Sequence, residues 1–413
     1  MWKWRKKQGV DADPTAPADV GTLASASLAI PIDVKDPAFL EDPESTHTVL
    51  RQDRPMCPLK GGGFLLTRHE DVVQALSSRD LGNAPSRFSV LNPKNREKYV
   101  AASVAEHILP FLDAPDHRGP RQKLSRAFYQ TFRDFQPQID RISANVITRL
   151  ADQGSVDLVE GPARDFACRT SAAFVGLTGS TEQLKALSGA FFRLFAPMQT
   201  AEDFAHTNSL LAEARSFVAQ ALRDRKTDEQ PCLLTALSQA DDKGPALDDA
   251  QVIDTAILVL ADGIENIEAG IGQVMRRLQT DPSDDVEEGY VREVLRLDTP
   301  AMMIPRVCRQ ATTINEVDMA AGTPVFLSLA SANRDSEAIS EAARFDPRRS
   351  RETSLTFGAG KHSCIGEPLA IAMITTFCAA LQKAGAKIEA GTPSYAPAFG
   401  HRWIRGISVS LDA

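Results

Sequence analysis

The stretch 357–366 constrains this chain most, because it places one cysteine in a glycine-rich segment directly before a predicted helix. Its ten residues read FGAGKHSCIG, and an apolar helical pattern begins near Pro368. Glycines let backbone N–H groups approach a sulfur atom closely, and the start of a helix carries partial positive charge. These features favour a shielded thiolate at Cys364. A buried free cysteine in a glycine-rich turn is the alternative.

The other cysteines argue against two common uses of this residue type. The six cysteines are scattered and form no CxxC pair, so we expect neither a structural zinc site nor a disulfide framework, and a reducing compartment. The composition is 43% hydrophobic and 24% charged, which allows a sizeable core. The net charge of −8 argues against nucleic acid as a partner.

No apolar run approaches the roughly 18–20 residues that would span a membrane. The chain starts MWKWRKK, which is basic, but no apolar segment follows as in a secretory signal. A frayed terminus explains this start, and a weak surface anchor is the alternative. We therefore expect a soluble, cytoplasmic protein without stable membrane insertion.

The organisation along the chain predicts a flexible segment over 1–30 and a single domain over 31–413, because residues 8–30 are rich in Ala, Asp, Pro and Ser. Apolar residues recur at helical spacing in four long stretches: 138–151, 183–195, 208–223 and 249–278. Strand-like runs are short and lie mostly beyond Pro300: 64–67, 323–329 and 404–411. The fold class is therefore mainly α with small β-sheets.

The cysteine stretch also carries a resemblance. The haem-binding signature of the cytochrome P450 family is matched without a gap by Phe357, Gly358, Gly360, His362, Cys364 and Gly366. The chain resembles this family over roughly 35–410, most of all its bacterial members. The resemblance implies the cytochrome P450 fold, with haem b (iron protoporphyrin IX) buried between a long distal helix and the cysteine loop. Cys364 would be the axial ligand, and a thiolate ligand supplies electron density that favours O–O cleavage.

The resemblance also implies a buried ion network that braces the haem-binding core. Glu293 and Arg296 lie three residues apart, on one helical face, and Arg349 is the expected third member. Glu341 and Arg344 have the same spacing, but a solvated surface pair is the ordinary interpretation of such a pattern.

Four further residues are expected to hold the haem propionates, which are carboxylates that need His or Arg partners. By resemblance these are His117, Arg121, Arg306 and His362. Each alone could be a surface charge, but their order along the chain matches the family.

The distal helix, 249–278, departs from the family pattern at its centre, where residues 262–266 read DGIEN. Glu265 fills the role of an acid that helps to deliver protons. Asn266 replaces a threonine that steadies bound oxygen, and its amide can donate and accept hydrogen bonds; a benign substitution is the alternative. Asp262 replaces a small residue. It could bind a cationic or hydroxylated substrate, act as an acid–base group with peroxide, or bond within a helix kink.

Family analogy places substrate-facing loops at about 83–105, 190–200, 300–304 and 396–403. They offer a largely apolar lining: Phe88, Val90, Leu91, Phe192, Phe195, Met198, Met302, Met303, Ile304 and Phe399. Ordinary core packing is the alternative for each of them. Arg87, Arg96 and His401 are candidates to meet a polar end of the substrate.

The expected function is a haem-thiolate monooxygenase that inserts one oxygen atom from O₂ into a small to medium hydrophobic substrate, by hydroxylation or O/N-dealkylation. Its electrons would come from NAD(P)H through ferredoxin reductase and ferredoxin, docked on Lys123, Arg126 and Lys361; a solvated basic face is the alternative for these residues. Two other functions stay open: a peroxide-using peroxygenase, and a non-catalytic haem-binding sensor or docking protein.

Overall fold

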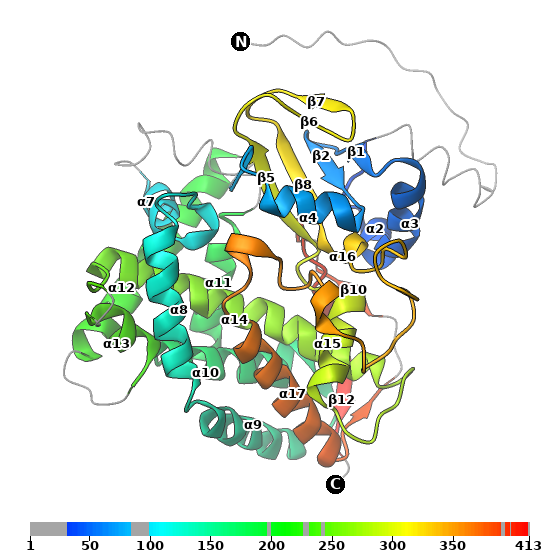
Figure 1. Cartoon of the computed structure of the whole chain (residues 1–413). Helices are drawn as coiled ribbons and strands as arrows, with labels where there is room; N and C mark the ends of the chain where they lie inside the picture. Colours follow the sequence, from blue (N-terminus) through cyan, green and yellow to red (C-terminus); the bar gives the residue numbers. More distant parts are fainter. Residues whose placement is uncertain are drawn as a thin grey trace.

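Helices form most of the ordered chain. A computed structural model describes residues 31–83, 99–195, 200–225, 231–240, 244–389, 393–396 and 398–411 (Figure 1). Its α-helices are α2 (Pro37–Glu41), α3 (Pro43–Asp53), α4 (His69–Ser77), α7 (Val100–His107), α8 (Arg118–Phe132), α9 (Gln136–Ala151), α10 (Arg164–Val175), α11 (Thr181–Phe192), α12 (Ala201–Arg225), α13 (Leu233–Ser238), α14 (Asp249–Arg277), α15 (Glu288–Leu297), α16 (Leu329–Ala332) and α17 (Glu367–Lys383).

The strands are short. They are β1 (Met56–Pro58), β2 (Phe64–Leu66), β3 (Leu81–Gly82), β4 (Val156–Asp157), β5 (Met303–Cys308), β6 (Thr312–Ile314), β7 (Val317–Met319), β8 (Pro324–Ser328), β9 (Lys387–Ile388), β10 (Ser394–Tyr395), β11 (Ile404–Arg405) and β12 (Ser408–Ser410). The expected fold class, mainly helical with small sheets, is confirmed.

The four helices expected from apolar spacing are confirmed as α9, α11, α12 and α14. The start of α14 agrees with the predicted residue because a capping box holds it. The Asp248 carboxylate accepts a hydrogen bond from the backbone N–H of Gln251, and the Gln251 side chain accepts one from the backbone N–H of Asp248. This reciprocal pair satisfies two N–H groups that a helix start otherwise leaves open.

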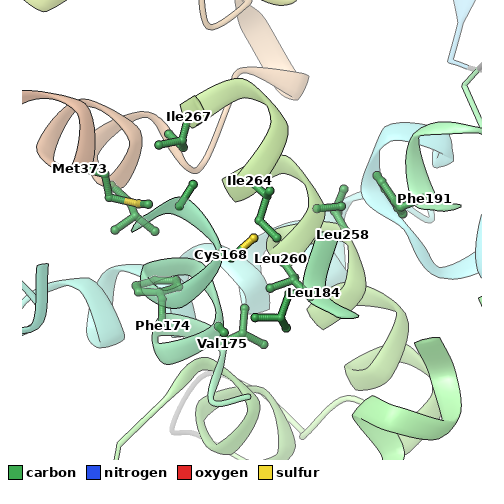
Figure 2. Close-up of a cluster of buried hydrophobic side chains, with 14 of the residues drawn as sticks. Cys168, Phe174, Val175, Leu184, Phe191, Leu258, Leu260, Ile264, Ile267 and Met373 are labelled. Atoms are coloured by element: carbon green, nitrogen blue, oxygen red, sulfur yellow. The ribbon is translucent and has the colours of Figure 1, made fainter. Parts of the chain in front are cut away.

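Helix α14 runs through the middle of the helical part and packs against α10, α11, α12 and α17 (Figure 1). Its apolar side chains are buried on several sides, as Figure 2 shows for Leu258, Leu260, Ile264 and Ile267. A helix with apolar residues on several sides is stable only when neighbours cover it. The sequence of α14 therefore places it inside the main hydrophobic core.

The largest sheet lies beside the helical part and has the strand order β1-β2-β8-β5-β3 (Figure 1). The β2–β8 pair is parallel and the other pairs are antiparallel. Both faces are covered: Leu65 and Phe326 join one apolar cluster, whereas Leu66 and Leu327 join another. The sheet thereby fixes β5, whose first residues reach the candidate site described below.

One expected strand is divided. Residues 404–411 were predicted to form a single strand, but the structure has β11 and β12 there, separated at Gly406. The backbone of Gly406 has φ of 70°, a left-handed conformation that interrupts a strand and that glycine adopts without strain. In consequence β11 pairs with β10, whereas β12 pairs with β4 and β9.

Among the helices in the described ranges, none combines the length and apolar character needed to cross a bilayer. The segment 1–30, for which flexibility was expected, lies outside the described residues.

Candidate active site

A cavity of about 370 Å³ lies between α14 and the loop that carries Cys364. Residues of α8, α14, α17 and the start of β5 form its walls. Most of the lining is apolar. The ionisable side chains of the lining are Arg121, Asp262, Arg306, His362, Cys364 and His401.

The Cys364 loop is held in shape by its own backbone. The N–H of Cys364 donates to the carbonyl oxygen of Phe357 over 2.8 Å, and Gly358 and Gly360 both have positive φ angles, 67° and 73°. Side chains other than glycine rarely adopt this conformation. Gly366 is the N-cap of α17, with Pro368 in the first turn. The loop therefore presents Cys364 to the cavity at the start of a helix.

The Cys364 side chain is exposed to the cavity, although many protein atoms lie around it. Burial raises the pKa of its thiol to about 12, and repulsion by Asp262 adds to the rise, whereas the Gly366 backbone N–H opposes it. A bound metal cation overcomes such a shift, because a coordinating thiol is deprotonated outright. Cys364 is thus suited to ionise when a cation occupies the cavity.

The ligand set fits a metal that brings most of its own ligands. Within the described residues, no three His, Cys, Asp or Glu side chains gather to hold a metal ion. Iron in a porphyrin already has four nitrogen ligands and needs only an axial one, which Cys364 can supply.

Two arginines and two histidines near the cavity fit the propionates of a haem. Arg121 donates to the carbonyl oxygen of Ser363 over 2.6 Å. Arg306 is buried and bonds only to the carbonyl of its neighbour Pro305, with no carboxylate in ion-pair range among the described residues. Burial lowers the pKa of Arg306 to about 10. A buried guanidinium without an anion is costly, which favours an acidic ligand here.

The histidines complete this group. The rings of His117 and His362 lie 4.0 Å apart between centroids, and the buried Nε2 atom of His117 has no hydrogen-bond partner. Burial, then repulsion by His117 and Arg306, lowers the pKa of His362 to about 3. The cofactor residues expected from sequence, including Phe357, Gly358 and Gly366, therefore all lie at or beside this cavity.

The structure also brings Glu293, Arg296 and Arg349 together. Arg296 bonds both carboxylate oxygens of Glu293 at 2.7 Å, and Arg349 reaches Glu293 at 3.2 Å. Arg296 further donates to backbone carbonyls beyond β8, which ties α15 to the segment before the Cys364 loop. The pair Glu341–Arg344 is exposed, as expected for a solvated pair.

Asp262 lies on the cavity side of α14. Its carboxylate has no hydrogen bond or ion pair with any described residue, and burial raises its pKa to about 7. Because α14 continues from Asp249 to Arg277 without interruption, bonding within a helix kink does not describe Asp262 in this structure.

The structure explains why residue 263 is a glycine. A Cβ atom there would lie 2.6 Å from the Ser171 hydroxyl oxygen, which donates to the carbonyl oxygen of Gly263. Helix α10 therefore crosses α14 closely at the cavity, and only glycine leaves room for this contact.

Glu265 points away from the cavity and does not line it. Its carboxylate accepts hydrogen bonds from Lys185 at 2.6 Å and Ser188 at 3.2 Å. Lys185 also bonds Glu268, which in turn pairs with Arg405 at 3.1 Å. Glu265 thus belongs to a buried ion network, and its role in proton delivery stays a prediction.

Asn266 lines the cavity and has a partner that the sequence did not indicate. The indole N–H of Trp403 donates to the Asn266 side-chain oxygen over 3.1 Å. Trp403 packs against Phe192 and His401. No spacing rule connects residues so far apart in the chain, so sequence reasoning had no signal for this pair.

The expected substrate residues divide into three groups. Phe192, Phe195, Met303 and Ile304 line the cavity, as does His401. Met302 and Phe399 were expected there but do not line it: they join the apolar cluster beside the sheet, where Phe399 packs on Phe326. A third group lies outside the described residues: Phe88, Val90, Leu91, Met198, Arg87 and Arg96. The lining also includes residues that were not expected: Leu109, Phe111, Leu258 and Val259.

The expected basic docking patch needs a correction. Lys123 is buried and donates to the carbonyl oxygen of Gln239 over 2.5 Å. Its ammonium group is therefore bonded within the protein rather than presented to a partner. Lys361 is exposed.

A surface recess of about 540 Å³ lies next to the Cys364 loop. It is lined by Tyr129, Arg292, Arg349, Arg351 and, from the loop itself, Phe357 and Gly358. This recess is the candidate docking surface.

Comparisons with known proteins agree with this geometry. A family model described as Cytochrome P450 matches residues 286–383, which contain Glu293, Arg296 and Cys364. The chain is 26% identical to a Vitamin D(3) 25-hydroxylase of Pseudonocardia autotrophica, covering 80% of this chain and 83% of that protein. It is 27% identical to Cytochrome P450 BJ-3 of Bradyrhizobium diazoefficiens, covering 96% and 99%.

Among solved structures, the chain is similar to an epothilone D-bound cytochrome P450epoK. The TM-score is 0.83 at 20% identity, and the match covers 93% of this chain and 100% of that one. At this identity the likeness shows the fold alone.

Proposed function

This chain belongs to the cytochrome P450 family and is a haem-dependent monooxygenase, and from this premise we propose the reaction of its cavity. The enzyme inserts one oxygen atom from O₂ into a small to medium hydrophobic molecule, by hydroxylation or dealkylation. The observation that supports this most is the cavity itself, in which Cys364 and an apolar wall including Phe192 and Val259 share one space. A substrate held by that wall would lie beside a metal bound at Cys364.

The haem supplies the oxygen chemistry when bound, because a thiolate ligand makes its iron rich enough in electrons to favour O–O cleavage. The residues proposed to hold it are Cys364 at the iron and Arg121, Arg306, His117 and His362 at the propionates. Arg121 and Arg306, which have no carboxylate partner in the described part of the chain, support this assignment. Charge-assisted bonds to carboxylates are the strong hydrogen bonds of such a site.

On α14 we assign oxygen and proton handling to Asn266 and Glu265. The indole N–H of Trp403 can only donate, so Asn266 must offer its oxygen to Trp403. Its NH₂ group is then left to donate to a ligand in the cavity. The Glu265 carboxylate accepts hydrogen bonds from Lys185 and Ser188. Its side chain would have to break these bonds to reach the cavity.

A reduced sample treated with carbon monoxide tests the haem assignment. We expect the red-shifted absorption band that thiolate ligation produces, and its loss in Cys364→Ser. A band at the position of nitrogen-ligated haem in the wild type would contradict the assignment of Cys364. Screening apolar compounds for displacement of the distal water, read from the absorption spectrum, then identifies substrates.

Electrons are proposed to come from NAD(P)H through an acidic ferredoxin that docks in the recess next to the Cys364 loop. Arg351 is exposed and lines that recess, and Lys361 is exposed in the Cys364 loop. An acidic partner is steered by such charges. Charge reversal at Arg351 and Lys361 should slow reduction and flatten its salt dependence. Lys60, which is paired with Asp33 near β1, is the control for a change of net charge. Reduction that is equally fast in both variants refutes this docking surface.

A second candidate is peroxide-driven oxygenation. The observation that favours it is the carboxylate of Asp262 in the cavity wall, which has no partner among the described residues, since an acid–base group beside a bound metal could move the protons of peroxide. Turnover with hydrogen peroxide, without a reductant, is the test. Product formation that requires reductant and O₂ rules this candidate out.

We also infer that residues 31–413 act as a single domain. The cavity takes its lining from residues as far apart in the chain as Leu76 and His401, so most of the described chain contributes to one site.

A further inference from the structure

Among the described residues, the acidic side chains of α14 differ in whether they have a cationic partner. Three buried carboxylates on this helix share one property, a cationic partner: Asp254 with Arg215 at 2.7 Å, Glu265 with Lys185 at 2.6 Å, and Glu268 with Arg405 at 3.1 Å. Asp262 lies among them but has no such partner in the described part of the chain. Asp262 is exposed to the cavity. Once a ligand fills the cavity and excludes water, an unpaired carboxylate is costly, so a cationic partner from the ligand is expected.

Among the described residues, the surroundings of Asp262 do not supply that partner. One turn before it, Leu258 and Val259 line the same wall, and Phe192 and Phe195 line the cavity from the end of α11. His401 also lines the cavity, but burial lowers the pKa of its imidazole to about 4, so it is neutral near pH 7. The described side chains next to Asp262 are therefore apolar or uncharged.

The charge balance of the site with haem bound also indicates that Asp262 needs a cationic partner. Arg121 and Arg306 are the arginines of the lining, and the two propionates of a haem use both. The Cys364 thiolate balances the net charge of a ferric porphyrin. The His362 ring bonds the Asn83 side chain over 2.6 Å and lies beside the ring of His117. Among the charged groups of the described lining, Asp262 is left without a counter-charge.

We propose that Asp262 is the counter-ion of a substrate that carries one positive charge on an apolar body, such as an amine or a quaternary ammonium compound. This inference rests on the proposed monooxygenase function and narrows its substrate class. The apolar walls hold the body of the substrate, and Asp262 holds its cationic group on the α14 side. A substrate bound in this way is oxidised at carbons close to the charged nitrogen, which fits N-dealkylation.

The test uses two ligands of the same shape. One is 4-phenylbutyl-trimethylammonium, and the other is its neutral isostere, in which a quaternary carbon replaces the nitrogen. The ammonium has no lone pair, so it cannot ligate iron and has no pKa of its own. Affinities of the haem-loaded protein for both ligands are measured from the spin-state change in the absorption spectrum and by calorimetry, without turnover.

The expected result is a change in the ratio of the two affinities. Relative to the isostere, the ammonium should lose about tenfold or more in affinity in Asp262→Asn, as expected when one partner of a desolvated charge pair is removed. Using the ratio cancels the greater hydrophobicity of the isostere. The matched control is Asp249→Asn, which makes the same change at the exposed first residue of α14. This control should keep the wild-type ratio.

Three results overturn the proposal: a ratio unchanged in Asp262→Asn, a ratio that falls equally in Asp249→Asn, or no binding of the ammonium to the wild type. The carbon monoxide spectrum of every sample is recorded first. A normal thiolate-type band with any of these results refutes only the substrate class, whereas an abnormal band in the wild type refutes the proposed function. If Asp262→Asn fails to take up haem, Asp262→Ala is measured in the same way.

Discussion

The indole N–H of Trp403 donates a hydrogen bond of 3.1 Å to the side-chain oxygen of Asn266, which joins the C-terminal segment to the middle of α14. Trp403 is buried and also packs on Phe192 and His401, so its position is fixed by more than this bond. The bond orients the Asn266 amide, because an indole N–H cannot accept. Trp403 is therefore a positioning residue for a side chain that lines the cavity.

Replacing Trp403 with Phe should keep an aromatic ring beside Phe192 but remove the hydrogen bond, which is worth about 0.5–1.5 kcal/mol. We expect the Asn266 side chain to rotate more freely. A larger share of the oxygen that the enzyme reduces should then be released without forming product. The measurement is the ratio of product to NAD(P)H consumed, which should fall several-fold while the carbon monoxide spectrum stays normal. An unchanged ratio would show that Asn266 does not need this partner.

Arg306→Met should have opposite effects on the protein with and without haem. The buried guanidinium has no carboxylate partner in the described chain, so its removal should raise the stability of the haem-free protein by about 1–3 kcal/mol. The same change should speed the loss of haem to an acceptor protein, because a propionate loses its partner. Denaturation of the haem-free form and the rate of haem transfer measure the two effects.

A suitable control for this variant is Arg309→Met. Arg309 is half-exposed and pairs with Asp113 at 2.9 Å, and it lies just beyond the end of β5. It should change haem loss little. Equal loss rates in the two variants would argue against a propionate role for Arg306.

Glu293→Gln should destabilise the fold. The variant removes the charge that balances Arg296, which is 1% exposed, and such a loss from a buried pair costs about 3–5 kcal/mol. The matched control is Glu341→Gln, which has the same spacing to Arg344 but breaks an exposed pair and should cost less than about 1 kcal/mol. Chemical denaturation compares the two. Similar midpoints for both variants are incompatible with a bracing role for Glu293.

Binding of the quaternary ammonium ligand should strengthen as the pH rises from about 6 to 8. Burial raises the pKa of Asp262 to about 7; the carboxyl is therefore protonated below this value and becomes an anion above it, while the ligand itself does not titrate. Two other ionisable groups of the lining keep their charge state in this window: burial lowers the pKa of His401 to about 4, so it stays neutral, and Arg306, with a pKa of about 10, stays charged.

Spectral titrations at several pH values, repeated with Asp262→Asn, measure this effect. The variant should show no dependence on pH over the same range. A wild-type affinity that does not vary with pH would mean that Asp262 does not titrate beside the bound ligand.

Much of the site could be predicted from residues close together in the chain. The Cys364 loop depends on local rules, namely glycines at positive φ and a helix that starts at Glu367. The bounds of α14 follow from its apolar spacing and from the cap at Asp248. The pairing of Glu293 with Arg296 follows from three-residue helical spacing. In each case the interacting groups are neighbours, so the sequence carries the information.

The sequence did not determine which side chains face the cavity once the helices are packed together. Asp262 and Glu265 are three residues apart on α14, yet Asp262 lines the cavity whereas Glu265 turns to Lys185. Lys123 was expected at the surface but is buried at Gln239, and Met302 and Phe399 pack beside the sheet. The partner of Asn266 is a tryptophan 137 residues away. Helical periodicity determines which residues share a face, but only the packing of α14 against α10, α11 and α17 decides which face meets the cavity.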